Sequence, residues 1–219
     1  MVTLSIKADF KEVNRQLNTL SDSVQRKVIP AALNKVAAKA KSEMTRAITS
    51  EFNIKNSEVN GYLRIIPAKR NVSGWFAVLD PFASDRRSAK PGTGLNLIRF
   101  VERKVTLFES RRRKKAGKQN KLFFKIKKTG GLVTLRGAFI ATSRRTGGTA
   151  VFTRIPGTRM LSRKGNTKHS EALQAKQTID IPQMFNTRRI NARVIAKIRQ
   201  ELPIEIQRAI SAVLSGNIR

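Results

Sequence analysis

Asp80, Glu102 and Lys104 are the residues whose types and order could support catalysis. Metal-dependent nucleases use an Asp…Glu-x-Lys pattern, in which two carboxylates bind a divalent cation and the lysine assists the attacking water. Such triplets arise readily by chance in a lysine-rich chain, and the usual Pro-Asp order is reversed here to Asp80-Pro81. The pattern therefore favours surface salt bridges, and a metal-dependent nuclease remains as an alternative.

Other catalytic arrangements lack the residues that they need. His169 is the single histidine and cysteine is absent, so the sequence offers no Ser/His/Asp or Cys/His arrangement. The GTG stretch at 92–94 does not continue into a phosphate-binding lysine motif, and a strand is expected after it. We therefore predict that the protein is not an enzyme and uses no cofactor and no metal.

An excess of basic residues is the strongest chemical signal in the sequence. The chain has 45 Lys and Arg against 14 Asp and Glu, a formal net charge of +31. The stretch SRRRKKAGKQNK (110–121) holds seven basic residues, and residues 110–170 hold eighteen with no carboxylate. Because this segment lacks internal counter-ions, we expect its partner to be a polyanion or an acidic protein surface.

Nucleic acid is the leading candidate for that partner, because duplex DNA carries about one negative charge per 1.7 Å of its axis. A single Trp and a single Tyr leave little for base stacking, and no base-reading module is recognisable. The expected mode is therefore phosphate contact without sequence reading. The predicted contact residues are Arg111, Arg112, Arg113, Lys114, Lys115, Lys118, Lys121, Arg144, Arg145, Arg189, Arg193 and Lys197.

The remaining composition predicts a folded chain without covalent staples. Hydrophobic residues make up 40% of the sequence and eleven residues are Phe, which is enough to bury a core. The start, MVTLSIKADF, lacks a signal-peptide pattern, and no apolar run approaches the length of a bilayer span. We expect a soluble protein that is made in a cytoplasm and does not contact a membrane.

Periodicity predicts one α+β domain over residues 1–219, which starts with a strand and helices in residues 1–66. VTLSIKA (2–8) alternates like a strand, and a short helix follows from about Asp9. A long amphipathic helix is expected from about Ser23 to Phe52, and a shorter one from about Asn56. The apolar face of the long helix contains Ile29, Leu33, Val36, Ala40, Met44, Ile48 and Phe52.

Residues 73–182 are expected to form a central antiparallel sheet. The Gly130-Gly131 and Gly147-Gly148 pairs are hairpin signals between successive strands. The basic stretch 110–121 lies between two strand patterns, so we expect it at the tip of a long hairpin. The predicted strands are GWFAVLD (74–80), LIRFVERKVTLFE (97–109), KLFFKIKK (121–128), LVTLRGAFIAT (132–142) and TAVFTRI (149–155).

Residues 183–217 are expected to form a pair of C-terminal helices. Pro203 removes a backbone donor, so it should bend the helical segment or split it in two. Arg189, Arg193 and Lys197 form a basic stripe beside an apolar stripe, which we expect to pack on the sheet and on the N-terminal helix. The apolar stripe is Ile190, Val194, Ile198, Leu202, Ile206, Ile210 and Leu214.

Five segments, taken in order, carry a family resemblance over nearly the whole chain. They are VIPAALNKVAAKA (28–40), RRRKK (111–115), GAFI (137–140), IDIP (179–182) and RQELPIEIQRAI (199–210). This order resembles the minor tail protein Z family of long-tailed, lambda-like phages, the tail-completion proteins. The chain is longer than that family's pattern between Ala141 and Lys176.

The resemblance implies a structural protein of a phage or prophage virion. Such proteins are assembled in the host cytoplasm and act late, at the head-proximal end of the tail, in head–tail joining and DNA passage. The implied partners are the tail terminator, the tail tube, the connector and the DNA end, with a homo-oligomeric ring of the chain itself. A sequence-independent nucleic-acid-binding protein remains as an alternative, and an acidic tail or neck protein as sole partner would give the same composition.

Overall fold

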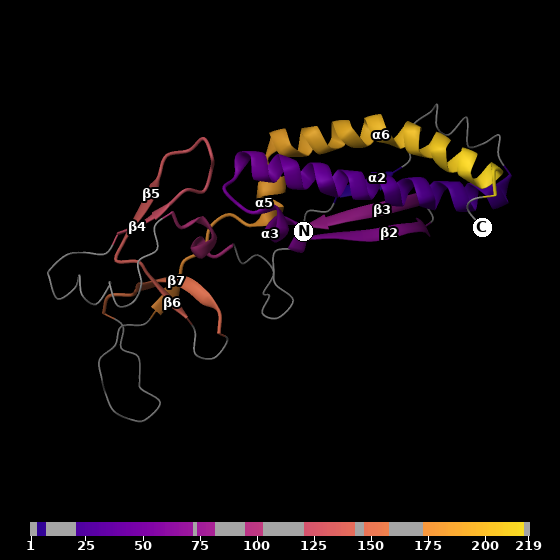
Figure 1. The fold of residues 1–219 in the computed structure, drawn as a ribbon. Coiled ribbons are helices and arrows are strands. Elements are labelled where there is room, and N and C mark those ends of the chain that lie inside the picture. The colour runs from indigo at the N-terminus through magenta and orange to yellow at the C-terminus, as the bar shows by residue number, and fades with distance from the viewer. Residues whose placement is uncertain are drawn as a thin grey trace, which may run out of the picture. The chain divides into compact units, whose positions relative to one another are not determined.

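A computed structural model shows long helices and short antiparallel strands, which confirms the predicted α+β class (Figure 1). The chain divides into two compact units. The first unit contains Met1–Ser50, Lys55–Pro91 and Ile181–Arg219, and the second contains Glu51–Ile54 and Gly92–Asp180. The structure describes residues 4–7, 21–71, 74–81, 95–102, 121–142, 147–157 and 173–216.

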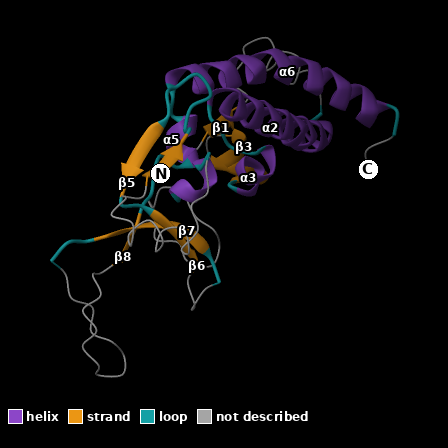
Figure 2. Cartoon of the chain, turned by 60° about the vertical axis from the view of Figure 1, so that its left-hand side comes forward, coloured by secondary structure: helices purple, strands orange, loops and turns teal. Residues whose placement is uncertain are grey.

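The first unit is built in layers around α2 (Asp22–Glu51), the long helix that the sequence predicts. Figures 1 and 2 show α2 between α6 (Arg188–Leu214) and a sheet of three strands. Because α2 has neighbours on two sides, it is buried over a broad face. All seven residues of its predicted apolar face, including Phe52 just after the helix, are buried.

The sheet of the first unit has the order β1-β3-β2 and is antiparallel throughout. Its strands are β1 (Leu4–Lys7), β2 (Leu63–Asn71) and β3 (Gly74–Pro81). The sequence predicted β1 and β3 but not β2, because Pro67 interrupts it. The register between β2 and β3 shifts between Ile66 and Lys69, so the proline lies in an irregular stretch. There the Ala68 N–H donates to Asn34 Oδ1 of α2 at 2.7 Å.

Two short helices join these layers. The predicted helix near Asn56 is α3 (Asn56–Gly61), and Thr45 Oγ1 of α2 donates to Asn60 Oδ1 at 3.0 Å. The second is α5 (Ile181–Phe185), which begins within the IDIP segment. No helix among the described residues is long and apolar enough to cross a membrane. The short helix predicted from Asp9 lies outside the described residues.

α6 is one continuous helix, so Pro203 does not divide it into the expected pair (Figure 1). The predicted apolar stripe is buried from Ile190 to Ile206, but Ile210 is only half-buried and Leu214 is 71% exposed. The reason is geometric: at about 100° per residue, a strict four-residue repeat drifts about 40° around the axis at each step. Ala209 therefore takes the buried position in the last turns. The apolar stripe of α6 was expected to pack on both the sheet and the N-terminal helix. Because α2 lies between α6 and the sheet, the stripe faces α2 and not the sheet.

Ion pairs join α2 to α6 along their length. Lys39 Nζ of α2 donates to Glu201 Oε2 and to Glu205 Oε1 of α6, both at 2.6 Å. In the other direction, Arg193 Nε of α6 donates to Glu43 Oε1 of α2. Since α2 numbers fall while α6 numbers rise along these contacts, the two helices run antiparallel. Glu205 is 2% exposed, so its charge is removed from water and depends on its partners.

The pKa values of this ion-pair network reflect its hydrogen bonds. Hydrogen bonds from Lys197 and Lys39 lower the pKa of Glu201 from 4.5 to about 2. Hydrogen bonding to Lys39 also lowers the pKa of Glu205, although burial opposes this shift. The two carboxylates in turn raise the pKa of Lys39. The network is therefore ionised at neutral pH.

The second unit consists of short antiparallel strands. β4 (Lys121–Phe124) pairs with β5 (Val133–Arg136), and a separate sheet has the order β6-β7-β8. Its strands are β6 (Phe139–Thr142), β7 (Thr149–Arg154) and β8 (Leu173–Ala175). Both glycine pairs separate antiparallel neighbours, as predicted.

Two strand predictions in this unit are corrected by the structure. Residues 132–142 form two strands in different sheets, because Gly137 has a φ of 71° and turns the chain between β5 and β6. Residues 97–100 form the 3-10 helix η1 (Leu97–Phe100), which Asn96 caps by accepting a hydrogen bond from the Ile98 N–H at 3.0 Å. Residues 103–109 of that predicted strand lie outside the described residues.

A first prediction compares two leucines of α6. Leu202 is fully buried and Leu214 is 71% exposed. Leu202→Ala removes packed methyl groups and should lower the free energy of unfolding by roughly 2–5 kcal/mol. Leu214→Ala is the matched control and should change it by less than about 0.5 kcal/mol. Urea denaturation followed by circular dichroism measures both, and equal losses would contradict the assignment of the buried face.

A second prediction concerns stability in acid. Because the folded pKa of Glu201 lies below its ordinary value of 4.5, its stabilising contribution is complete above that pH and is lost as pH falls towards 2. Glu201→Gln should therefore have a lower midpoint of urea denaturation than wild type at pH 7. At pH 2.5 the difference between the two midpoints should be smaller. Glu102→Gln, at an exposed position, is the control and should leave the wild-type profile unchanged. If the midpoints of Glu201→Gln and wild type differed by the same amount at both pH values, the proposed contribution of the ionised Glu201 to stability would be contradicted.

Candidate functional site

The basic segment of the second unit starts and ends at one place in the fold. The Glu102 N–H donates to the Phe123 carbonyl at 3.0 Å, and the Lys125 N–H donates to the Phe100 carbonyl at 2.9 Å. Val101 forms an antiparallel bridge with Phe124 between these two bonds. The described chain therefore ends at Glu102 and resumes at Lys121 close to the same place, and the predicted long hairpin between them lies outside the described residues.

Buried apolar residues support these two ends. Phe100 is 1% exposed, and Leu122 and Phe124 are fully buried. Phe124 thus belongs to the core. Packing at these residues fixes the points from which the basic segment leaves and returns. Arg111, Arg112, Arg113, Lys114, Lys115 and Lys118 lie between those points and outside the described residues, and Lys121 is the first residue of β4.

A second short connection in this unit also carries predicted contact residues. β6 and β7 pair up to the Thr142–Thr149 position, where the two hydroxyl oxygens are 3.1 Å apart. Arg144 and Arg145 belong to the connection between these threonines and lie outside the described residues.

The third predicted group, on α6, does not form a uniformly free basic stripe. Arg193 is held by Glu43 and Lys197 by Glu201, the latter pair at 2.8 Å. Arg189 is exposed and makes no ion pair with another described residue. The four-residue spacing explains this difference, because the stripe winds about 40° per step from the solvent side towards α2. Arg193 therefore contributes to the contact between the two helices, a role expected of the apolar stripe alone, whereas Lys197 pairs with Glu201 of its own helix.

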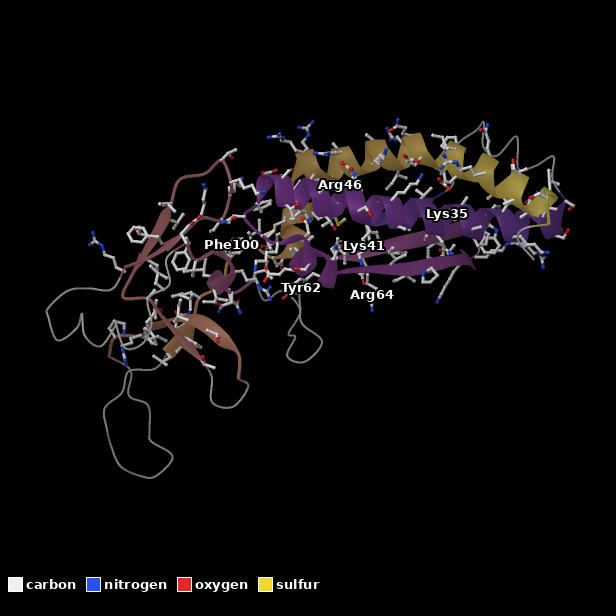
Figure 3. All side chains as sticks on the ribbon, viewed as in Figure 1. Lys35, Lys41, Arg46, Tyr62, Arg64 and Phe100 are labelled. Atoms are coloured by element: carbon white, nitrogen blue, oxygen red, sulfur yellow. The ribbon has the colours of Figure 1, made fainter. Side chains whose placement is uncertain are left out.

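The described carboxylates in ion pairs use only a few of the basic residues. Glu43, Glu51, Asp80, Glu201 and Glu205 each pair with a Lys or Arg. Many exposed cations make no ion pair with another described residue, among them Lys35 and Arg46 of α2 (Figure 3). The others are Arg26, Lys27, Lys55, Lys69, Arg70, Lys128, Arg136, Arg154, Arg188, Arg189 and Arg199.

The nuclease-like residues do not form a recognisable site among the described residues. Asp80 is 1% exposed and accepts a hydrogen bond from Arg64 Nη2, its cross-strand neighbour on β2. Glu102 belongs to the second unit and is exposed, and Lys104 lies outside the described residues. Within the described ranges, no group of three or more His, Cys, Asp or Glu side chains could hold a metal ion. Asp80 is therefore explained as the buried half of a salt bridge.

His169 and the GTG stretch (92–94) lie outside the described residues. The chemistry that the described residues offer is therefore electrostatic. Exposed guanidinium and ammonium groups can neutralise an anionic surface, and they do so without discriminating between sequences.

Comparison with known proteins gives a family match. A sequence model of the family described as Prophage minor tail protein Z (GPZ) matches residues 9–216, nearly the whole chain. No curated protein and no solved structure matches the chain. The matched range includes both compact units and the basic segment between Glu102 and Lys121. The chain thus belongs to the prophage minor tail protein Z family and is a structural component of a phage tail.

Proposed function

We propose that this tail protein acts at the head-proximal end of the tail, where it helps to join tail to head and holds the DNA end through phosphate contacts. The tail terminator, the tail tube and the connector are its proposed protein partners. The proposed DNA contacts are Arg111, Arg112, Arg113, Lys114, Lys115, Lys118, Lys121, Arg144, Arg145 and Arg189. Arg193 and Lys197 are left out of this set because Glu43 and Glu201 hold them.

One observation carries the proposal: residues 110–170 hold eighteen basic residues and no carboxylate. All of them belong to the second unit, which has twenty-two Lys or Arg against five Asp or Glu. Self-repulsion at this density opposes folding, and the segment contains no counter-ion of its own. DNA phosphates would supply the missing negative charge.

The way in which the basic segment is attached supports this use. Its two ends meet at a base fixed by the Glu102–Phe123 and Lys125–Phe100 hydrogen bonds. Because these two ends are held together, we expect the cations between them to act on one partner. Repetition of the chain in a closed ring would place several such segments around one axis and multiply the field there.

A salt titration tests the DNA contact. The purified chain should bind duplex DNA equally well across unrelated sequences, and its log affinity should fall linearly with log salt concentration. Replacing Arg111, Arg112, Arg113, Lys114 and Lys115 by Gln should reduce the slope by up to about 0.9 for each phosphate that is no longer neutralised. Fluorescence anisotropy with labelled 30-base-pair duplexes gives both quantities.

A charge-matched variant is the control for that experiment. Arg26, Lys27, Lys35, Arg46 and Lys55 are exposed, make no ion pair with another described residue and remove the same charge when replaced by Gln. We expect this control to change the slope much less than the loop variant does. Equal changes would mean that net charge alone governs binding, and a strong preference between DNA sequences would contradict the phosphate-contact mode.

Position on the virion is tested separately. A gold-labelled affinity tag on the chain should appear at the head-proximal end of isolated tails in negative-stain electron microscopy. Tails assembled without the chain should fail to join filled heads. Labels along the shaft or at the distal tip, with normal joining, would rule out the proposed position.

A further inference from the structure

The β4–β5 hairpin exposes large apolar side chains next to its turn. Leu132 is 58% exposed and Val133 is 53% exposed, and the two are consecutive in the chain. They follow the Gly130-Gly131 turn and lead into β5. Single exposed apolar residues are common on proteins, but an adjacent pair at the start of a strand needs an explanation.

This apolar surface continues the core of the second unit. Val133 is the cross-strand partner of Phe124, and Leu135 is the partner of Leu122. Cross-strand partners lie on the same face of a sheet, so these four side chains form one face. Phe124 and Leu122 are fully buried, whereas Leu135 is half-buried and Val133 is exposed. The apolar face is therefore buried where β4 contributes to it and partly exposed to solvent where β5 does.

The backbone of β5 offers an open edge as well. β4 pairs with β5 on one side and is bonded to Phe100 and Glu102 on its other side. Among the described residues, β5 has no second strand partner. The edge strand β2, in contrast, carries Pro67 in an irregular stretch, which discourages pairing. β5 (Val133–Arg136) contains no proline, so a further strand can be added to it.

The charges around the hairpin indicate the chemistry of that added strand. Lys128 and Arg136 are exposed beside it and make no ion pair with another described residue. A second copy of the chain is disfavoured, because it would bring the same cations together in a protein of net charge +31. DNA would satisfy Lys128 and Arg136 but would leave Leu132 and Val133 without apolar contact. An acidic protein segment with alternating apolar residues matches both features.

We propose that β5 is a docking edge for an acidic, extended segment of another protein. The segment adds as a strand to β5, its apolar side chains cover Val133 and Leu135 on one face, and its carboxylates meet Lys128 and Arg136. Main-chain hydrogen bonds to β5 supply affinity, and the alternation of side chains supplies selectivity. Lys121, one of the proposed DNA contacts, is the cross-strand partner of Arg136 at one end of this edge. The inference rests on the edge and the apolar face of β5, so it holds whether or not the basic loop binds DNA.

Three labelled peptides test the proposal on the full-length chain. EVEVEVE carries both acidic and apolar side chains, EGEGEGE keeps the charge without the apolar groups, and KVKVKVK reverses the charge. In fluorescence anisotropy at about 100 mM salt, EVEVEVE should bind about tenfold more tightly than either of the others. Equal binding of EVEVEVE and EGEGEGE would contradict the apolar contact, and equal binding of KVKVKVK would contradict the charge match.

Substitutions then locate the binding edge. Leu132→Ser combined with Val133→Thr changes only exposed side chains and keeps a β-branched residue in the strand, so the thermal melt should match wild type. This double variant should abolish the preference for EVEVEVE, whereas Leu214→Ser, at another exposed leucine, should preserve it. A preference that survives the double variant overturns the proposal. If the double variant instead lost affinity for duplex DNA, the edge would be a DNA contact and the proposal would be wrong. If it lost self-association, the edge would be a contact between copies of the chain, and the proposal would again be wrong.

Discussion

The antiparallel contact between α2 and α6 depends on a few carboxylates placed where the two helices meet. Glu43 on one helix and Glu201 and Glu205 on the other are paired with cations of the opposite helix. Glu205 is nearly fully buried, so the loss of Lys39 would leave a charge without its interhelical partner in the packed interface. In a chain with 45 basic and 14 acidic residues, this placement lets two basic helices pack side by side.

The same placement leaves the rest of the positive charge without internal compensation. Asp80 is taken by Arg64 within the sheet, and Glu51 pairs with Lys127 at 3.6 Å in the second unit. Residues 110–170 have no carboxylate that could serve in this way. The first unit thus uses acidic residues to build a layered scaffold, while the second unit joins a small β-core to an uncompensated basic segment. This division fits a structural tail protein whose basic segment we propose to contact DNA phosphates.

The sequence predicts those parts of the fold that depend on local periodicity. The apolar repeat from Ile29 to Phe52 predicts α2 to within one residue at each end, because a helix buried over a broad face keeps its pattern in sequence. The strand that contains Pro67 and the turn at Gly137 depend on which neighbour each residue meets in space. The drift of the α6 stripe at Leu214, in contrast, follows from its four-residue spacing. The partners of Lys39 lie more than 160 residues away, so the network could not be read from spacing. Among the predicted contact residues, the basic segment follows from local pattern, and so does the Lys197–Glu201 pair, whose spacing is four residues. The pairing of Arg193 with Glu43 required the tertiary fold.

Lysine acetylation footprinting, with and without duplex DNA, tests the division between paired and uncompensated cations most directly. Mass spectrometry after brief acetylation reports the reactivity of each lysine in the intact protein. We predict that Lys39 reacts slowly in both conditions, because Glu201 and Glu205 hold its ammonium group and raise its pKa. Lys114, Lys115 and Lys118 should react rapidly in the free protein and become protected by DNA, while the exposed Lys35 stays reactive throughout. Protection of Lys35 to the same degree as the loop lysines, or a Lys39 as reactive as Lys35, would contradict the account.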